Sequence, residues 1–405
     1  MTAVPVTIAR PATSSRIQSV DALRGAIMML MAIDHIRDFV ARSAMQFSPT
    51  DLSRTTTAIF FTRWVTHFCA PVFFLTAGIG ACLWMQRGHH SKPELSRFLI
   101  TRGLWLMFLE ITVLRVIMFS QVEYRGSVVL LFILWAIGAA MIALAGLIYL
   151  PTAVLAALSV AIIALHNLLD GVSAKQFGPA AWIWHVLHQP GFIRIGGINF
   201  RTAYVVLPWI GVIAAGYCLG PVFTWDAVRR RRFLIRLGAT ITVAFVVIRA
   251  INLYGDPFPW EHQPSTLFTV LSFLNTTKYP PSCDFLLMTL GPALIALALL
   301  EGSRFSPGNP LVVFGRVPFF YYVLHLALAH LIMIGMNFVR YGRAPFLLLA
   351  PPSMGSDAKL FPPNFGYPLW AVYVVWIVVL LLLYPVCRWF ARLKQRRHDW
   401  WLSYL

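Results

Sequence analysis

The sequence predicts an all-α fold, a polytopic bundle of transmembrane helices. Of its 405 residues, 59% are hydrophobic and only 12% are charged, whereas soluble chains carry about 25% charged residues. The mean hydropathy is +0.71, and the apolar residues fall into runs near the roughly 20 residues that a helix needs to cross a bilayer. These observations exclude a water-soluble globular protein.

Apolar windows predict about ten membrane-spanning helices within one transmembrane domain at residues 21–388. The predicted spans are residues 21–41, 60–85, 98–119, 127–147, 151–168, 203–223, 233–254, 284–301, 311–338 and 367–387. Residues 1–20 and 389–405 are expected to form cytoplasmic tails, the second of them basic.

The basic residues favour an orientation with both termini inside (N-in, C-in). The formal net charge is +18, and Lys and Arg cluster between apolar runs, as at 229–232 and 392–397. Cytoplasmic loops carry such an excess, and on this orientation the inside segments are roughly twice as basic per residue as the outside ones. Membrane topology therefore explains the charge better than nucleic acid as a partner. The long loops near 169–202, 255–283 and 339–366 then face outward.

The first span concentrates ionisable side chains, which are costly in a membrane and mark candidate functional sites. Arg24 and His35 are eleven residues apart, so they differ by only about 20° around a helix and by about 16 Å along it. Asp21, Met28, Met31 and Asp38 fall on the same stripe. A stripe with a charged inner end and an apolar middle suits an elongated, end-charged ligand. The alternative is that Asp21 and Arg24 are a helix N-terminal acid and a snorkelling cation.

Asp34 and His35 form the strongest candidate pair for catalysis. A carboxylate can fix the imidazole tautomer and leave the other nitrogen to take a proton. Consecutive helix residues diverge by 100°, however, so Asp34 can instead face a neighbouring helix. In the second span His67 lies roughly 10 Å deep, at the level of His35. The two histidines are either base and partner, or two polar groups that satisfy each other.

Later spans supply further candidates. Lys278 and Asp284 belong to a polar, helix-breaking segment at 275–284, for which we expect a cavity-lining loop. In the ninth span, His325 reaches the depth of His35, whereas His330 lies on a different face. One of these two histidines is expected to line the cavity.

Other polar groups are predicted to play no part in chemistry. His89 and His90 are expected to be solvated in a short basic loop. The five cysteines are widely spaced, and no His-Glu-x-x-His motif or Cys cluster is present. We therefore expect neither disulfides nor a bound metal.

These motifs resemble bacterial relatives of the heparan-alpha-glucosaminide N-acetyltransferase catalytic domain, within a wider superfamily of transmembrane acyltransferases. The resemblance rests on residues 21–25, 34–39, 67–74, 278–282 and 314–325 and extends over almost the whole chain. Arg24 and His35, with ten residues between them, also match the Arg-x10-His spacing of a related family that O-acetylates surface polysaccharides.

The resemblance implies transfer of an acetyl or other acyl group from cytoplasmic acyl-CoA to a hydroxyl or amino group at the outer face. Acetyl-CoA would be the donor substrate, and the acceptor a glycan or small metabolite. The implied location is the cytoplasmic (inner) membrane of a bacterium, where the chain contacts the lipid bilayer and can form a homo-oligomer. The predicted roles are catalytic for His35, Asp34 and His67, donor-binding for Asp21, Arg24, Arg102 and Arg316, and acceptor-binding for Asp38, Lys278, Asp284 and His325.

Two questions stay open at the level of sequence. The acceptor can attack the thioester directly, with His35 as base, or an acyl-histidine can form first. The same buried charges would also suit a transporter or exporter of a polar or anionic metabolite. Transporters often show two repeated halves with broken helices, and no such repeat is evident in this sequence.

Overall fold

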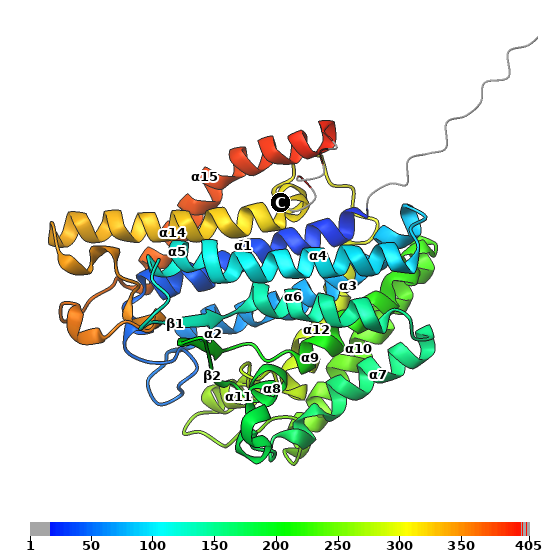
Figure 1. Ribbon diagram of the computed structural model, residues 1–405, viewed down its shortest axis with the longest axis horizontal. Helices are drawn as coiled ribbons and strands as arrows, with labels where there is room; N and C mark the ends of the chain where they lie inside the picture. Colours follow the sequence, from blue (N-terminus) through cyan, green and yellow to red (C-terminus); the bar gives the residue numbers. More distant parts are fainter. Residues whose placement is uncertain (1–16, 398, 400–401, 403–405) are drawn as a thin grey trace, which may run out of the picture.

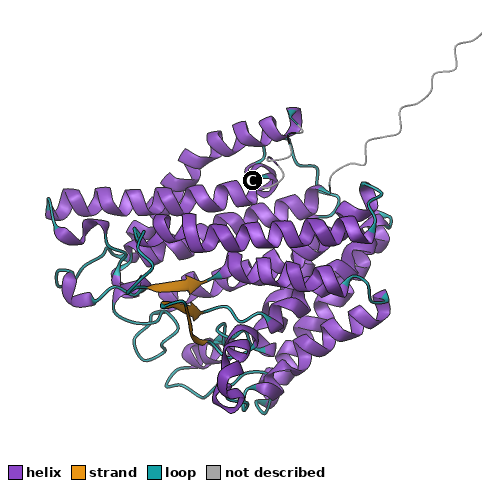
Figure 2. Cartoon of the chain, in the orientation of Figure 1, coloured by secondary structure: helices purple, strands orange, loops and turns teal. Residues whose placement is uncertain are grey.

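The computed structural model describes residues 17–397, 399 and 402, and most of these residues are helical (Figures 1 and 2). The α-helices are α1 (Gln18–Val40), α2 (Thr57–Trp64), α3 (Cys69–Arg87), α4 (Lys92–Leu109), α5 (Arg115–Phe119), α6 (Ile133–Leu147), α7 (Thr152–Leu165), α8 (Ala181–Leu187), α9 (Leu207–Leu219), α10 (Ala227–Ile251), α11 (Thr266–Leu274), α12 (Cys283–Leu300), α13 (Pro310–Arg316), α14 (Pro318–Tyr341) and α15 (Leu369–Arg396). Shorter turns are η1 (Arg42–Met45), η2 (Val65–Phe68), the π-helical η3 (Glu110–Leu114), η4 (His166–Leu169), η5 (Ala174–Ala180), η6 (Gly220–Thr224), η7 (Pro345–Leu348), η8 (Pro352–Met354) and η9 (Ala358–Leu360).

The predicted helical membrane bundle is confirmed. Within the described residues, seven helical segments are long and apolar enough to cross a membrane: Thr57–Arg87, Thr152–Leu169, Leu207–Thr224, Ala227–Ile251, Cys283–Leu300, Pro318–Tyr341 and Leu369–Arg396. The other predicted spans, 21–41, 98–119 and 127–147, coincide with α1, α4 and α6. The count of ten spans and their orientation stay predictions. Helix α15 continues through residue 396, so part of the predicted C-terminal tail is helical, and residues 1–16 of the N-terminal tail lie outside the described residues.

Helix α1 lies in the interior, between α4 and α14 in the view of Figure 1. It meets α13 at two glycines. A Cβ atom at Gly25 would lie 1.8 Å from the carbonyl oxygen of Leu311, and one at Gly315 would lie 1.8 Å from that of Asp21. Only glycine permits this approach of the two backbones, as at many helix contacts in membranes. The contact fixes α1 against the segment that carries Arg316.

A small sheet departs from the purely helical prediction. Strands β1 (Val128–Leu131), β3 (Ile198–Thr202) and β2 (Gly191–Ile195) pair in that order. β1 occupies the beginning of the predicted span 127–147, because a short apolar run suits a strand as well as a helix. The Glu110 carboxylate accepts the backbone N–H of Leu134 at 2.7 Å. This contact satisfies an N–H group of the first turn of α6, so the helix begins only at Ile133.

The predicted ninth span, 311–338, is two helices. The break falls at Val317, whose φ of −130° is not helical. Pro318 follows, and its ring removes a backbone donor, so it suits the first position of a new helix. As a result α13 and α14 follow separate paths along α1 and bring different side chains to it.

Candidate active site

A cavity of about 410 Å³ lies beside the N-terminal half of α1. Its walls come from α1, α3, α4, α6 and α14, and most of the lining side chains are apolar. The two basic residues in the lining are Arg24 and Arg102. Arg24 Nη2 donates to the backbone oxygen of Thr76 at 2.5 Å, which fixes the guanidinium at the cavity wall. A cavity with this lining suits a ligand with a polar, anionic end and an apolar arm.

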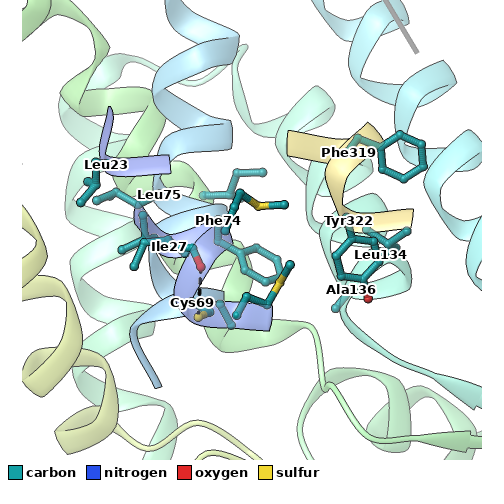
Figure 3. Close-up of a cluster of buried hydrophobic side chains, with 14 of the residues drawn as sticks. Leu23, Ile27, Cys69, Phe74, Leu75, Leu134, Ala136, Phe319 and Tyr322 are labelled. Atoms are coloured by element: carbon teal, nitrogen blue, oxygen red, sulfur yellow. Dashed lines mark hydrogen bonds between the residues drawn. The ribbon is translucent and has the colours of Figure 1, made fainter. Parts of the chain in front are cut away.

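Tyr322 connects this cavity to a pair of histidines. Its ring lines the cavity, and its centroid is 6.0 Å from that of His35 and 5.6 Å from that of His325. Figure 3 shows Tyr322 of α14 beside Leu134 and Ala136 of α6. His35 itself is not among the lining residues, so Tyr322 is the lining side chain that contacts the imidazole.

His35 and His325 form a direct hydrogen bond. The distance between His35 Nδ1 and His325 Nε2 is 2.7 Å. His325 is fully buried, and its Nδ1 lies 3.1 Å from the Tyr321 carbonyl oxygen. A carbonyl only accepts, so in a neutral pair His325 Nδ1 carries the proton and His325 Nε2 accepts from His35 Nδ1. The lone pair of His35 then lies on Nε2, and the partly exposed imidazole is set up as a base.

The Asp34 carboxylate pairs with arginines and makes no hydrogen bond to His35 within the described residues. Arg63 Nη1 donates to its Oδ2, and Arg37 Nη2 lies 3.0 Å from its Oδ1. Arg37 also donates to Asp38 at 2.6 Å. The carboxylate therefore faces α2, which is the second of the two orientations that helix geometry allows. His325 accepts the hydrogen bond that orients His35, and a catalytic role for Asp34 stays a prediction.

His67 lies on η2, the short turn between α2 and α3. Its ring packs on Phe285 with centroids 5.4 Å apart, and its buried Nδ1 has no hydrogen-bond partner in the described part of the chain. The structure therefore shows no hydrogen bond between His67 and His35. Nearby, Cys69 Sγ donates to the Ile27 carbonyl oxygen at 3.7 Å, as the dashed line in Figure 3 shows. Cys69 is a buried residue of the hydrophobic core.

Lys278 reaches the histidines from an irregular loop between α11 and α12. It is 8% exposed, and it interacts electrostatically with Asp34, His35 and His67. Its ammonium lies 5.3 Å from the ring centroid of Tyr279, a side chain that is 45% exposed. The loop thus brings a buried cation close enough to interact with His35.

A clamp of polar side chains, which we call the Asp256 clamp, holds this loop. The Asp256 carboxylate accepts from the Thr277 backbone N–H at 2.7 Å and from the Ser282 hydroxyl at 2.6 Å, on either side of Lys278. Beneath it, Arg249 donates to the carbonyl oxygens of Ser272, Phe273, Asn275 and Phe258. Asp284 Oδ2 lies 3.6 Å from Arg249 Nη1, so this predicted acceptor contact lies against the clamp.

The other predicted site residues lie near the start of α1 or farther along α14. Arg316 Nε is 3.9 Å from Asp21 Oδ2, and Arg316 is not among the residues that line the cavity. His330 bonds to the Ile117 carbonyl oxygen and stacks on Phe39. Of the two histidines of α14, the structure therefore brings His325 to the site. Among the described residues, no group of three or more His, Cys, Asp or Glu gathers as a metal site would require.

Sequence reasoning missed Tyr322 and Asp256. Tyr322 lies three residues before His325, so it shares a helical face with that histidine, and this spacing is a usable signal. Asp256 lies in a loop, and nothing in its local sequence distinguishes it from a solvated turn residue.

Comparison with known proteins identifies the family. The model of the catalytic domain of heparan-alpha-glucosaminide N-acetyltransferase matches residues 16–253. The matched stretch includes His35, His67, Arg24 and Arg102, and it ends before Lys278 and His325. No curated protein matches the chain. Because the match covers more than half of the 405 residues, the chain belongs to the heparan-alpha-glucosaminide N-acetyltransferase catalytic-domain family.

Proposed function

We propose that this membrane acetyltransferase moves an acyl group from acyl-CoA, held in the cavity, to a hydroxyl or amino group bound beside His35. Family membership supports the acetyltransferase class. The observation that carries the proposal is Tyr322, which lines the cavity and contacts both imidazoles. A donor that fills the cavity would bring its thioester to this ring.

The donor would lie along the N-terminal half of α1. Arg24 and Arg102 would pair with the phosphates of CoA, since guanidinium groups bind phosphate through paired hydrogen bonds. The apolar walls, including Met28, would hold the pantetheine arm. Asp21 and Arg316 lie paired near the start of α1, and they remain predicted contacts of the nucleotide part of the donor.

The chemical step would be a direct attack. His35 Nε2 takes the proton of the acceptor hydroxyl or amino group, and the freed oxygen or nitrogen bonds to the thioester carbon. The carbon–sulfur bond then breaks, and the CoA sulfur leaves with the proton that His35 returns. His325 Nε2 accepts the hydrogen bond from His35 Nδ1–H throughout, which stabilises the imidazolium form of His35. The Tyr322 hydroxyl is the candidate donor to the oxyanion.

The acceptor would enter from the side of Lys278 and Tyr279. Lys278 and Asp38 are its proposed polar contacts. Asp284 would act indirectly, because it lies against Arg249 beneath the loop. His67 remains a proposed catalytic residue that assists His35, as its buried Nδ1 has no hydrogen-bond partner among the described residues. The chemistry of these side chains fits a glycan or a small metabolite.

Binding of the donor tests the proposal. The full chain in nanodiscs should bind radiolabelled acetyl-CoA saturably and release CoA when acceptors with hydroxyl or amino groups are added. Arg102→Gln should raise the donor Kd by about tenfold, because a charge-assisted contact to phosphate is lost. Arg340→Gln, on the far part of α14, is the matched control and should leave the Kd unchanged.

Absence of saturable binding at millimolar acetyl-CoA would overturn the acyltransferase proposal and favour the transporter. Rapid quenching with labelled donor and no acceptor separates the two chemical routes. Unlabelled protein supports the direct attack, whereas label on a histidine shows an acyl-enzyme.

A further inference from the structure

Three aromatic rings form a continuous stack at the turn between α3 and α4. The centroids of Trp84 and His90 are 3.8 Å apart with ring planes 13° apart. Phe98 is also stacked on Trp84, with centroids 4.8 Å apart and ring planes 9° apart. The sequence predicts a solvated His90, but this imidazole lies flat on an indole.

The backbone of the turn is shaped to hold His90 in this place. A Cβ atom at Gly88 would lie 2.3 Å from the His90 ring, so a larger residue at this position would displace the imidazole. His89 adopts a left-handed conformation with φ 51°, and the His90 N–H donates to the Met85 carbonyl oxygen at 3.0 Å. Directly after His90, Ser91 begins α4 with a capping box. The fold therefore specifies the position of the ring.

The stack adjoins the cavity and its arginines. Trp84 and Phe98 both line the cavity, as do Arg24 and Arg102. The Arg102 guanidinium carbon lies 5.8 Å from the Phe98 ring centroid and covers that end of the stack. At the other end, the outer face of His90 has no ring partner within the described part of the chain. His90 is only partly buried, and a ring at the end of a stack can accept a further planar group.

We propose that the face of His90 turned away from Trp84 binds the purine base of the CoA donor, an inference that rests on the proposed function. The adenine nucleotide of CoA combines a planar aromatic base with phosphates. Aromatic side chains bind bases by stacking, and Arg24 and Arg102 lie within reach of the phosphate part of a ligand in the same cavity. Arg87 and Lys92, exposed on the same turn, add positive charge around the opening. The stack thus selects a donor that carries a nucleotide.

A comparison of two donors tests this assignment. Acetyl-CoA and S-acetyl-pantetheine share the thioester and the arm, but only the first carries the nucleotide. In nanodiscs, His90→Ala should weaken the binding of acetyl-CoA by about tenfold and leave that of S-acetyl-pantetheine unchanged. His90→Phe, which retains a ring, should restore most of the affinity, and Trp84→Leu should reproduce the loss. His262→Ala removes a histidine that packs on Trp260 in another loop and should have no effect.

The possible outcomes separate the inference from the function on which it rests. If the native chain binds neither donor, the proposed function fails. If it binds acetyl-CoA but His90→Ala leaves that affinity unchanged, or weakens both donors equally, the purine assignment alone is wrong.

Discussion

The two halves of α1 contribute to regions of opposite construction. The N-terminal half forms one wall of a cavity lined mainly by apolar side chains, with arginines as its basic groups. The C-terminal half carries His35, Asp34 and Asp38, each tied to a partner by a hydrogen bond or an ion pair. The first region selects a ligand by its shape and charge. The second region fixes individual hydrogen bonds, and with them which nitrogen of His35 carries a proton. Changes in the first should therefore alter donor affinity, and changes in the second should alter the rate.

The largest effect should come from the base itself. His35→Gln should lower kcat by roughly 10² to 10⁴-fold, the usual contribution of general base catalysis, with the donor Kd unchanged. Steady-state kinetics provide kcat, and acetyl-CoA binding to the same sample provides the donor Kd. His330→Gln alters a histidine of α14 outside the site and should keep full activity. An active His35→Gln variant would remove the central residue of the mechanism.

The second-largest effect on kcat should come from His325, the hydrogen-bond partner of His35. His325→Leu should reduce kcat by about 10 to 100-fold, because His35 Nδ1 loses the acceptor that fixes its tautomer. His325→Gln should retain more activity than the leucine variant, since an amide oxygen can still accept that proton. Equal loss in both variants would show that side-chain volume, and not hydrogen bonding, is what matters at this position.

A smaller effect should come from the Asp256 clamp, which holds the loop that carries Lys278. Asp256→Asn exchanges one acceptor oxygen for a donor, and should destabilise the fold by about 1 to 3 kcal/mol as partners become unsatisfied. We expect acyl transfer to fall by about tenfold and donor binding to stay unchanged, since Lys278 lies on the acceptor side. Asp51→Asn, in an exposed turn where Asp51 accepts from Ser53, is the control. Equal loss of donor affinity would contradict the separation of the two regions.

The smallest effect should arise at the capping box beneath His90. Hydrogen bonds from the backbone N–H and hydroxyl of Ser91 lower the pKa of Glu94. A lowered folded-state pKa means that this stabilisation is present above the usual pKa of Glu and is lost as pH falls through the lowered value. Ser91→Ala should therefore raise the donor KM by about twofold near pH 7. This difference from the native chain should fade at acidic pH, and KM measured at both pH values checks it.

Local geometry explains what the sequence could predict. The stripe from Arg24 to His35 depends only on the helical repeat within α1, and the structure places these two residues at the cavity and at the histidine pair. The bond between His35 and His325 joins residues far apart in the chain, so it depends on how α13 and α14 pack. The sequence placed two histidines on different faces of that span without showing which face meets α1.

The remaining differences have the same physical origin. Asp34 had two possible directions, and only the position of Arg63 on α2 decides between them. The run at 128–147 is apolar throughout, and the Glu110 carboxylate that accepts the first N–H groups of α6 comes from a distant part of the chain. His90 lies in a polar turn that looks solvated, and its stacking on Trp84 depends on the backbone path through Gly88.

The glycine contact between α1 and α13 has a consequence for biogenesis. Gly25 and His35 leave the ribosome long before Gly315 and His325, an interval of roughly 15 to 60 s at ordinary rates of synthesis. During this time α1, with its buried Asp21, Asp34 and Arg37, must wait in the insertion machinery without the surfaces that later enclose it. Nascent chains truncated before α13 should accordingly stay bound to membrane insertases and chaperones, and release should coincide with the emergence of α14.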